Sequence, residues 1–293
     1  MIRSRADKNF ERMAYIVMSL VALIIIVPFV VLFMSSVTEE SSLLKNGYSM
    51  FPKAFSLEAY RFIWQSKRTI FRAYGITLMV TAIGTALNVT ITALVAYPLS
   101  LERLPGKSLI SFMILFSMLF SGGLLPTYMT YTGVFHIKNT FAALLVPNLM
   151  FSPVNAIIVR TYLRSNVPSD LYESARIDGA GELYIFYKIV LPLGKPIFVT
   201  VGIFAGLGYW NDWMNGLYYV SDNSMYSIQQ LLNVMIQNIQ YLAQYGSSSG
   251  FGKVPAVSVR MAIAFVAMLP VLLIYPFLQK YFEKGITLGA VKG

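Results

Sequence analysis

The chain carries the polar stretch Tyr172-Glu173-Ser174-Ala175-Arg176-Ile177-Asp178-Gly179-Ala180-Gly181 between two long apolar runs. It is charged and punctuated by glycine, in a chain that is otherwise strongly hydrophobic. A simple connection between two membrane spans has little reason to fold into a compact polar helix-turn-helix. The stretch therefore favours a surface on which something outside the bilayer docks, with an inert interfacial connector as the alternative.

Residues 164–196 predict two short helices joined by a turn. Ser169 is expected to cap the first helix, because a serine oxygen can accept from a free N–H at the helix start. Gly179 is expected to end it in the left-handed conformation. The second helix is predicted from about Glu182 to Leu191-Pro192, since the residue before proline disfavours the helical region. We expect that helix to present Leu183, Phe186, Tyr187 and Val190.

The composition indicates a membrane protein. Of the 293 residues, 56% are hydrophobic and 12% are charged, about half the charged share of an ordinary soluble domain. The absence of Cys excludes disulfides and thiol chemistry, and a single His136 argues against a His-based metal site. The net charge of +10 comes from residues beside apolar runs, as membrane topology requires. This placement argues against nucleic-acid binding.

The apolar runs predict an all-α polytopic protein with six transmembrane helices in one domain, 1–293. Each run approaches the length needed to cross a bilayer. The first is too long for a signal peptide and has no cleavage site after it, so we expect it to remain. Fourteen of the 23 Lys and Arg residues fall on the inner side if the N-terminus is inside, which predicts N-in/C-in. The spans are expected near 13–35, 74–98, 108–127, 140–163, 197–217 and 258–279.

The pattern Glu-x-Ala-x-x-Asp-Gly-Ala, followed by Phe, Ile and Leu-Pro, resembles the EAA loop of permease subunits of ATP-binding-cassette (ABC) importers. One residue departs from the pattern, because Ser174 stands where the first Ala is usual. The resemblance implies that 164–196 is a cytoplasmic loop whose first helix couples to an ATPase. It assigns that contact to Leu171, Tyr172, Glu173, Ser174, Ala175, Asp178, Gly179 and Ala180.

Further elements extend the resemblance over nearly the whole chain. The segment 120–128 resembles the SGG-x-x-PTY element of carbohydrate permeases, 209–213 resembles their W-N-D/E element, and 280–293 resembles the end of maltose-type (MalG-like) permeases. Together they point to the carbohydrate uptake-1 family, with the lipoprotein-dependent, LplC- and YtcP-like branch as the nearest. That family implies a type I importer permease in the bacterial cytoplasmic membrane, working by alternating access on oligosaccharides or polysaccharide fragments.

The same resemblance implies the partners. They are a second, non-identical permease subunit, two ABC ATPase subunits that bind ATP and Mg, and an extracellular or periplasmic solute-binding protein. No cofactor is expected on this chain. The loop 218–257 is long and rich in Gln, Asn and Ser. By resemblance it enters the binding protein, and the alternative is a cap folded on its own subunit.

Asp212 is the only acidic residue in or bordering the fifth apolar run. An acid at such a place is a functional-site hypothesis, and the aromatic and amide side chains around it suit sugar rings and hydroxyls. The alternative is a structural cap where the helix reaches the interface, with tryptophan as a belt residue. The expected substrate path comprises Tyr128, Trp210, Asn211, Asp212, Trp213 and Asn215.

Two other classes of function are weighed against an importer permease. No G-x-x-x-x-G-K-[ST] motif occurs, so we do not expect this chain to be an ATPase or another enzyme. A secondary carrier would need charged coupling residues at the midplane and related repeats. Asp212 alone could serve, and it lies near a membrane face. The sequence therefore favours a permease that draws its energy from a partner.

Overall fold

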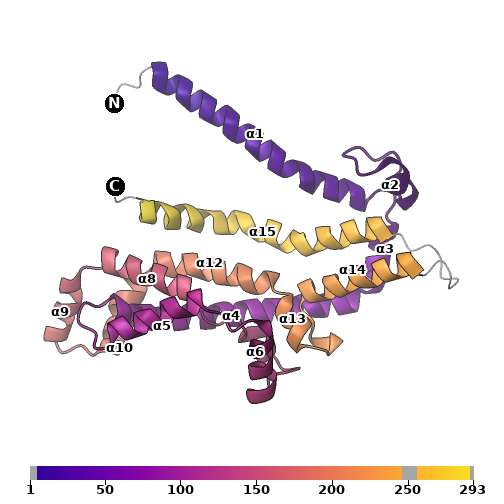
Figure 1. Ribbon diagram of the computed structural model, residues 1–293. Helices are drawn as coiled ribbons and strands as arrows, with labels where there is room; N and C mark the ends of the chain where they lie inside the picture. Colours follow the sequence, from indigo (N-terminus) through magenta and orange to yellow (C-terminus); the bar gives the residue numbers. More distant parts are fainter. Residues whose placement is uncertain (1–4, 246–255, 291–293) are drawn as a thin grey trace. The chain divides into compact units, whose positions relative to one another are not determined.

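The computed structural model describes residues 5–245 and 256–290, and these are helical with no strand among them (Figure 1). Residue contacts divide the chain into two units, Met1–Arg68 with Leu232–Pro270, and Thr69–Leu231 with Val271–Gly293. The first unit contains α1 (Arg5–Ser36), α2 (Glu40–Asn46), α3 (Glu58–Gln65), most of α14 (Ile228–Tyr245) and the first part of α15 (Ala256–Ala290).

Polar contacts of the first unit gather where α1 ends. Ser36 Oγ lies 2.7 Å from the Tyr60 hydroxyl of α3. The Glu40 carboxylate accepts from the backbone N–H groups of Val257 and Ser258 at 2.9 and 2.8 Å. These are N–H groups at the start of α15 that have no partner within the helix, so a carboxylate there also complements the helix dipole. Glu40 therefore fixes α2 to the beginning of α15.

The second unit begins with α4 (Lys67–Ser100) and α5 (Lys107–Leu119). It continues with α6 (Leu124–Met129), the π turn η1 (Thr130–Val134), α7 (Ala142–Leu145), α8 (Pro153–Asn166) and α9 (Ser169–Ile177). Then follow α10 (Glu182–Ile185), the π turn η2 (Phe186–Val190), α11 (Leu191–Leu193), α12 (Lys195–Asn211), α13 (Met214–Tyr219) and the 3₁₀ turn η3 (Asn223–Met225).

Within this unit α12 packs on both α4 and α8 (Figure 1). Gly202 and Gly206 lie one turn apart on α12, and a Cβ at either position would lie 3.4 Å from Val89 and 3.3 Å from Thr85, respectively. Two small residues at this spacing let helix backbones approach closely. The GxxxG pair thus marks the contact between α4 and α12.

Three of the predicted continuous runs are interrupted in the structure, and the shortest interruption is 212–213 in the run 197–217. The run 108–127 breaks at 120–123, and the helices on either side make an angle of 115°. Gly123 has a φ of 82°, which glycine adopts without steric cost. The run 140–163 contains the non-helical segment 146–152, in which Asn148 has a φ of 63° and Pro147 and Pro153 lack the N–H donor of a helix.

Side chains from three neighbouring helices bind the carbonyl groups around the break at 146–152. Tyr209 Oη donates to the Leu145 carbonyl at 2.8 Å. Asn215 Nδ2 donates to the Pro147 carbonyl at 2.9 Å, and Asn88 Nδ2 to the Leu149 carbonyl at 2.8 Å. A non-helical backbone in a membrane protein is tolerated where protein groups satisfy it. These bonds therefore allow 146–152 to leave the helical conformation inside the helix bundle.

The candidate membrane spans follow the same interruptions. By length and composition Asn9–Ser36, Lys67–Ser100 and Ala256–Ile274 could each cross a membrane. Two bent pairs pass the same criterion when joined, Lys107–Leu119 with Leu124–Val134, and Glu182–Leu193 with Lys195–Asn211 at 79°. The described residues thus contain three to five candidate spans.

Gly84 on α4 should be intolerant of a side chain. A Cβ there would lie 2.4 Å from Cζ of the buried Tyr209 ring, whereas a Cβ at Gly75 on the same helix meets nothing within 4 Å. We expect Gly84→Ala to lower the free energy of unfolding by about 1–3 kcal/mol, the usual cost of overpacking. Gly75→Ala should be neutral or stabilising, because alanine favours helix. Thermal unfolding of both variants in mild detergent checks this. Equal midpoints would contradict the packing described for Tyr209.

Candidate functional site

The first helix of the loop 164–196 is α9. Its N-cap is Pro168, one residue before the predicted cap, and Ser169 is the first helical residue. The Ser169 hydroxyl lies near the Asp170 carboxylate and does not bind a backbone N–H. The prediction of Ser169 as cap is therefore wrong, because the fixed φ of Pro168 already sets the extended entry into the helix. Asp178 is the C-cap.

Gly179 ends α9 in the predicted left-handed conformation, with a φ of 81°. The Gly179 N–H donates to the Arg176 carbonyl at 3.0 Å, and the Ala180 N–H to the Ala175 carbonyl at 2.9 Å. These bonds satisfy carbonyl groups that the helix end would leave free. The turn therefore sends the chain back toward the body of the unit.

One face of α9 is buried against that body. Tyr172 is 6% exposed and belongs to a hydrophobic core with residues of α4, α8 and α12, against which Ala175 and Ala180 also pack. Its ring meets the Tyr97 ring edge-on at 5.9 Å between centroids. Three of the residues assigned to the ATPase contact thus lie on the inner side of the helix, where they hold α9 in place.

The outer side of α9 is exposed. It carries Leu171, Ser174 and Asp178, and next to them Ile177, whose side chain is 85% exposed. Glu173 is exposed too, at the edge of α9 that faces the turn after α4. Ile177 was not singled out from the sequence, although its place in a charged helix was a signal: an apolar side chain directed away from the core of its own unit suits a partner surface. Leu183, Tyr184 and Tyr187 continue this exposed surface on the second helix of the loop.

The second helix differs from the prediction in two ways. It does not end at Leu191-Pro192, since α10 passes through the π turn η2 into α11 and ends at Leu193. A π turn widens the helix just before the proline, which is one of the known ways to accommodate a kink. Phe186 and Val190 are buried in the core rather than presented outward.

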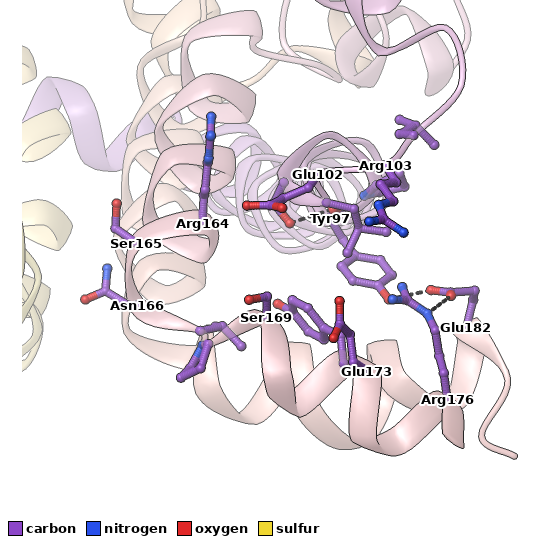
Figure 2. Close-up of a pocket in the computed structure, with 17 residues that line it drawn as sticks. Tyr97, Glu102, Arg103, Arg164, Ser165, Asn166, Ser169, Glu173, Arg176 and Glu182 are labelled. Atoms are coloured by element: carbon purple, nitrogen blue, oxygen red, sulfur yellow. Dashed lines mark hydrogen bonds and ion pairs between the residues drawn. The ribbon is translucent and has the colours of Figure 1, made fainter. Parts of the chain in front are cut away.

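An unpredicted set of polar contacts joins α4 to the loop (Figure 2). Tyr97 Oη donates to Glu182 Oε2 at 2.6 Å, and Arg176 Nε donates to Glu182 Oε1 at 2.7 Å. Arg176 first, and Tyr97 second, hold the pKa of the Glu182 carboxyl below its usual range. Tyr97 is separated from Glu182 by 85 positions in the chain. No local pattern could have paired them.

A cavity of about 780 Å³ opens beside these contacts, between α9 and the turn after α4. Figure 2 shows Arg164 and Glu102 on one side and Glu173 and Arg176 on the other. Tyr172 lines this cavity, and its buried hydroxyl has no hydrogen-bond partner among the described residues. The loop is thus fixed along one edge and separated from the α4–α5 turn by a polar space along the other.

The residues predicted for the substrate path make different contacts in the structure. Asp212 Oδ1 accepts from the N–H groups of Met214 and Asn215 at 3.1 and 3.2 Å, so this carboxylate caps α13. The buried Asn215 binds the Pro147 carbonyl, and the exposed Asn211 binds the Leu207 carbonyl of its own helix. This is the capping arrangement that the sequence offered as the alternative.

The aromatic residues of that set lie in different surroundings. Trp210 is buried, with its ring 6.5 Å from that of Tyr74, and its indole N–H has no hydrogen-bond partner within 5–245 and 256–290. Trp213 is 38% exposed. Tyr128 stacks on Tyr219 at 5.7 Å between centroids. Trp213 is thus the aromatic residue of this set that offers a free face.

Residues 89–288 match the family model described as binding-protein-dependent transport system inner membrane component. This match covers more than half of the sequence. The chain belongs to this family. It is therefore an inner membrane permease component of a transport system, a class whose members move a solute and are not themselves catalysts.

Two relatives from Bacillus subtilis (strain 168) cover almost all of this permease. Protein LplC is 34% identical over 100% of this chain and 98% of its own length. The polygalacturonan/rhamnogalacturonan transport system permease protein YtcP is 36% identical over 98% of this chain and 99% of its own length. The resemblance to this branch of ABC permeases is therefore confirmed.

The fold has a match among solved structures. A chain in the crystal structure of a bacterial ABC transporter involved in the import of the acidic polysaccharide alginate superposes with a TM-score of 0.80. The match covers 96% of this permease and 99% of that chain at 24% identity. The all-helical fold is therefore that of an ABC permease. In the predicted C-terminal element 280–293, residues 291–293 lie outside the described residues, as do 246–255 of the predicted outer loop.

Gly179 and Gly181 allow a direct test of the turn. Gly179 has a φ of 81° and Gly181 a φ of −73°, and a Cβ at either position meets nothing within 4 Å. We expect Gly179→Val to lower the free energy of unfolding by about 1–2 kcal/mol, because an L side chain is strained in the left-handed region. Gly181→Val should have little effect, since valine adopts an extended backbone readily. Limited proteolysis of the loop and thermal unfolding report both. A larger effect at Gly181 would refute the turn geometry.

Proposed function

We propose that this permease forms half of the translocation path of an ATP-driven importer of oligosaccharides or polysaccharide fragments. The named cargoes of YtcP and of the alginate transporter are acidic polysaccharides or their pieces, which supports this substrate class. The partners that we propose are a second, non-identical permease, two ABC ATPases that bind ATP and Mg, and a solute-binding protein.

The topology that we propose is six transmembrane helices with both termini in the cytoplasm. The helices of 9–36, 67–100 and 256–274, the bent pair of 107–134, and α12 would supply five crossings. The sixth would be α8 together with the segment 140–152, whose carbonyl groups are satisfied by Tyr209, Asn215 and Asn88. The excess of Lys and Arg on the side of the loop 164–196 supports a cytoplasmic location for it.

The exposed face of α9 is the observation that carries the coupling role. Tyr172, Ala175 and Ala180 anchor the helix, while Leu171, Glu173 and Ile177 leave an apolar and acidic surface uncovered. We assign this surface, with Ser174, Asp178 and Gly179, to the ATPase contact. A basic or amide group of the ATPase would meet Glu173. The core around Tyr172 then carries a displacement of α9 to α4, α8 and α12 as one packed body.

The Tyr97–Glu182–Arg176 contacts would also transmit a movement of the loop to α4. They connect the end of α4 to both helices of the loop, through hydrogen bonds in which the carboxylate is ionised. In the alternating-access cycle that we propose, closure of the ATPase pair moves α9, and α4 follows through these bonds. Hydrolysis then returns the helices to the inward-facing arrangement.

Ile177→Asp tests the docking surface without disturbing the fold, because the Ile177 side chain is 85% exposed. Tagged wild type and variant would be purified gently from native membranes, and co-purifying proteins identified by mass spectrometry. We expect ATPase recovery to fall about tenfold or more, as for loss of an interface hot spot, and uptake to fall with it. Leu44→Asp on α2, where the side chain is 71% exposed, is the matched control.

Equal ATPase recovery from Ile177→Asp, Leu44→Asp and wild type would remove the coupling role from this face. Recovery of the chain alone in all three samples would instead favour a secondary carrier. A second permease of the same family among the co-purifying proteins would support the heterodimer.

Substitutions of Asp212 distinguish a helix-capping role from a role in the substrate path. Asp212→Asn keeps an oxygen that can accept from Met214 and Asn215, whereas Asp212→Ala removes it and should cost about 1 kcal/mol of stability. We expect the Asn variant to unfold like wild type and yet to take up sugar severalfold more slowly, because the charge is lost at the end of α12. Normal uptake by a stable Asn variant would restrict Asp212 to the capping role.

A further inference from the structure

A groove with a cationic end lies between α5 and α8, which pack on each other. Lys107 and Ser111 stand one turn apart on α5, and Arg160 and Arg164 one turn apart on α8. Residues at this spacing share a helix face. Each helix thus places basic residues at the end nearest the α4–α5 turn.

The basic residues of this end form no ion pair within the part of the chain that the structure describes. Lys107 experiences the positive charges of both Arg160 and Arg164, with Glu102 as the opposing negative charge, and its ammonium group donates to the Leu101 carbonyl. Neither Arg160 nor Arg164 makes a hydrogen bond or ion pair with any described residue, and Arg160 is half-buried. A partly buried guanidinium without a counterion is unfavourable. The cluster therefore favours binding of an anion, and the planar guanidinium of arginine suits a phosphate group.

An apolar crevice of about 90 Å³ begins at the same place. Arg160 forms part of its wall, so the charged end and the crevice are continuous. The Ser111 hydroxyl in this crevice is buried and has no hydrogen-bond partner in the described part of the chain. Its lining is otherwise apolar and comes from α4, α5 and α8: Leu99, Ile114, Leu115, Ala156 and Ile157.

The outer face of α5 beyond the crevice is also apolar. Phe112, Met113 and Phe116 are each more than 45% exposed, on a helix that begins at a lysine. A ligand of this groove must therefore combine negative charge with a hydrocarbon part and lie beside apolar helix surface. A free phosphate would leave the crevice unused, whereas a phospholipid of the bilayer meets all three conditions. Basic pockets between membrane helices on the cytoplasmic side are known to hold such head groups.

We propose that this groove binds an anionic phospholipid of the leaflet next to the coupling loop. Its phosphate would lie against Arg160 and Lys107, and the first part of one acyl chain would enter the crevice beside Ser111. The site goes beyond the transport role. It rests on the membrane placement of the chain and not on the coupling role of α9. The two can fail separately, because lipid retention needs neither ATPase nor uptake.

Native mass spectrometry of the full chain in mild detergent measures this directly. Phosphatidylglycerol and phosphatidylcholine would be added separately. We expect preferential retention of phosphatidylglycerol, and binding about 30-fold weaker in the double variant Arg160→Gln with Lys107→Gln, since two basic contacts are lost. The matched control is Lys188→Gln with Lys195→Gln, which removes two exposed positive charges from the loop 164–196. It should retain the lipid like wild type.

A second pair of variants tests the crevice without changing charge. Ser111→Leu should fill it and weaken phosphatidylglycerol retention, while Ser111→Ala leaves it open and should not. Equal retention of the two lipids, equal retention by the two double variants, or full retention by Ser111→Leu would each overturn the site. Displacement of the lipid by inorganic phosphate at the same concentration would show that the cluster binds a free anion instead.

Discussion

The fold depends on the hydrogen bonds that satisfy the backbone carbonyl groups where the chain leaves the helical conformation, between Leu145 and Pro153. In a membrane no water is present to bind them, so protein donors must do so. Tyr209, Asn215 and Asn88 provide those donors from α12, α13 and α4. Because one non-helical segment is held from three directions, these helices and the break form a single cooperative unit. Removal of one donor would leave a buried acceptor unpaired and weaken the remaining contacts.

The coupling loop, 164–196, is held mainly by apolar packing and less by polar contacts. Its inner face is hydrophobic and anchored by Tyr172, and its outer face is exposed, with Ile177 and the neighbouring apolar residues among its polar side chains. The Arg176–Glu182 pair is partly exposed, with side chains 39% and 55% accessible, so it contributes at most about 1 kcal/mol. Packing thus fixes the position of the loop, and the polar contacts determine its orientation toward α4.

The sequence predicted the features that local chemistry controls. The apolar runs, the helix-turn-helix of 164–196 and the left-handed Gly179 each depend on residues within one or two turns. Features that depend on distant partners were not predictable in this way. Tyr97 meets Glu182 across 85 positions, and whether Phe186 and Val190 point inward depends on α4 and α12. Ser169 was misjudged because Pro168 competes for the same role. The breaks at 120–123 and 146–152 contain glycine or proline, but these residues are also tolerated inside membrane helices, so they did not locate the breaks.

The contact between Gly84 and the Tyr209 ring constrains how α4 and α12 can move. The ring occupies the space that a side chain at position 84 would fill. A shift of α12 by one turn along α4 would bring this ring against Val80 or Asn88, where no such space exists. Axial sliding of the pair is therefore blocked, while rotation of both helices together is not. We therefore expect α4 and α12 to move together as a pair, because the Tyr209 ring fixes their axial register.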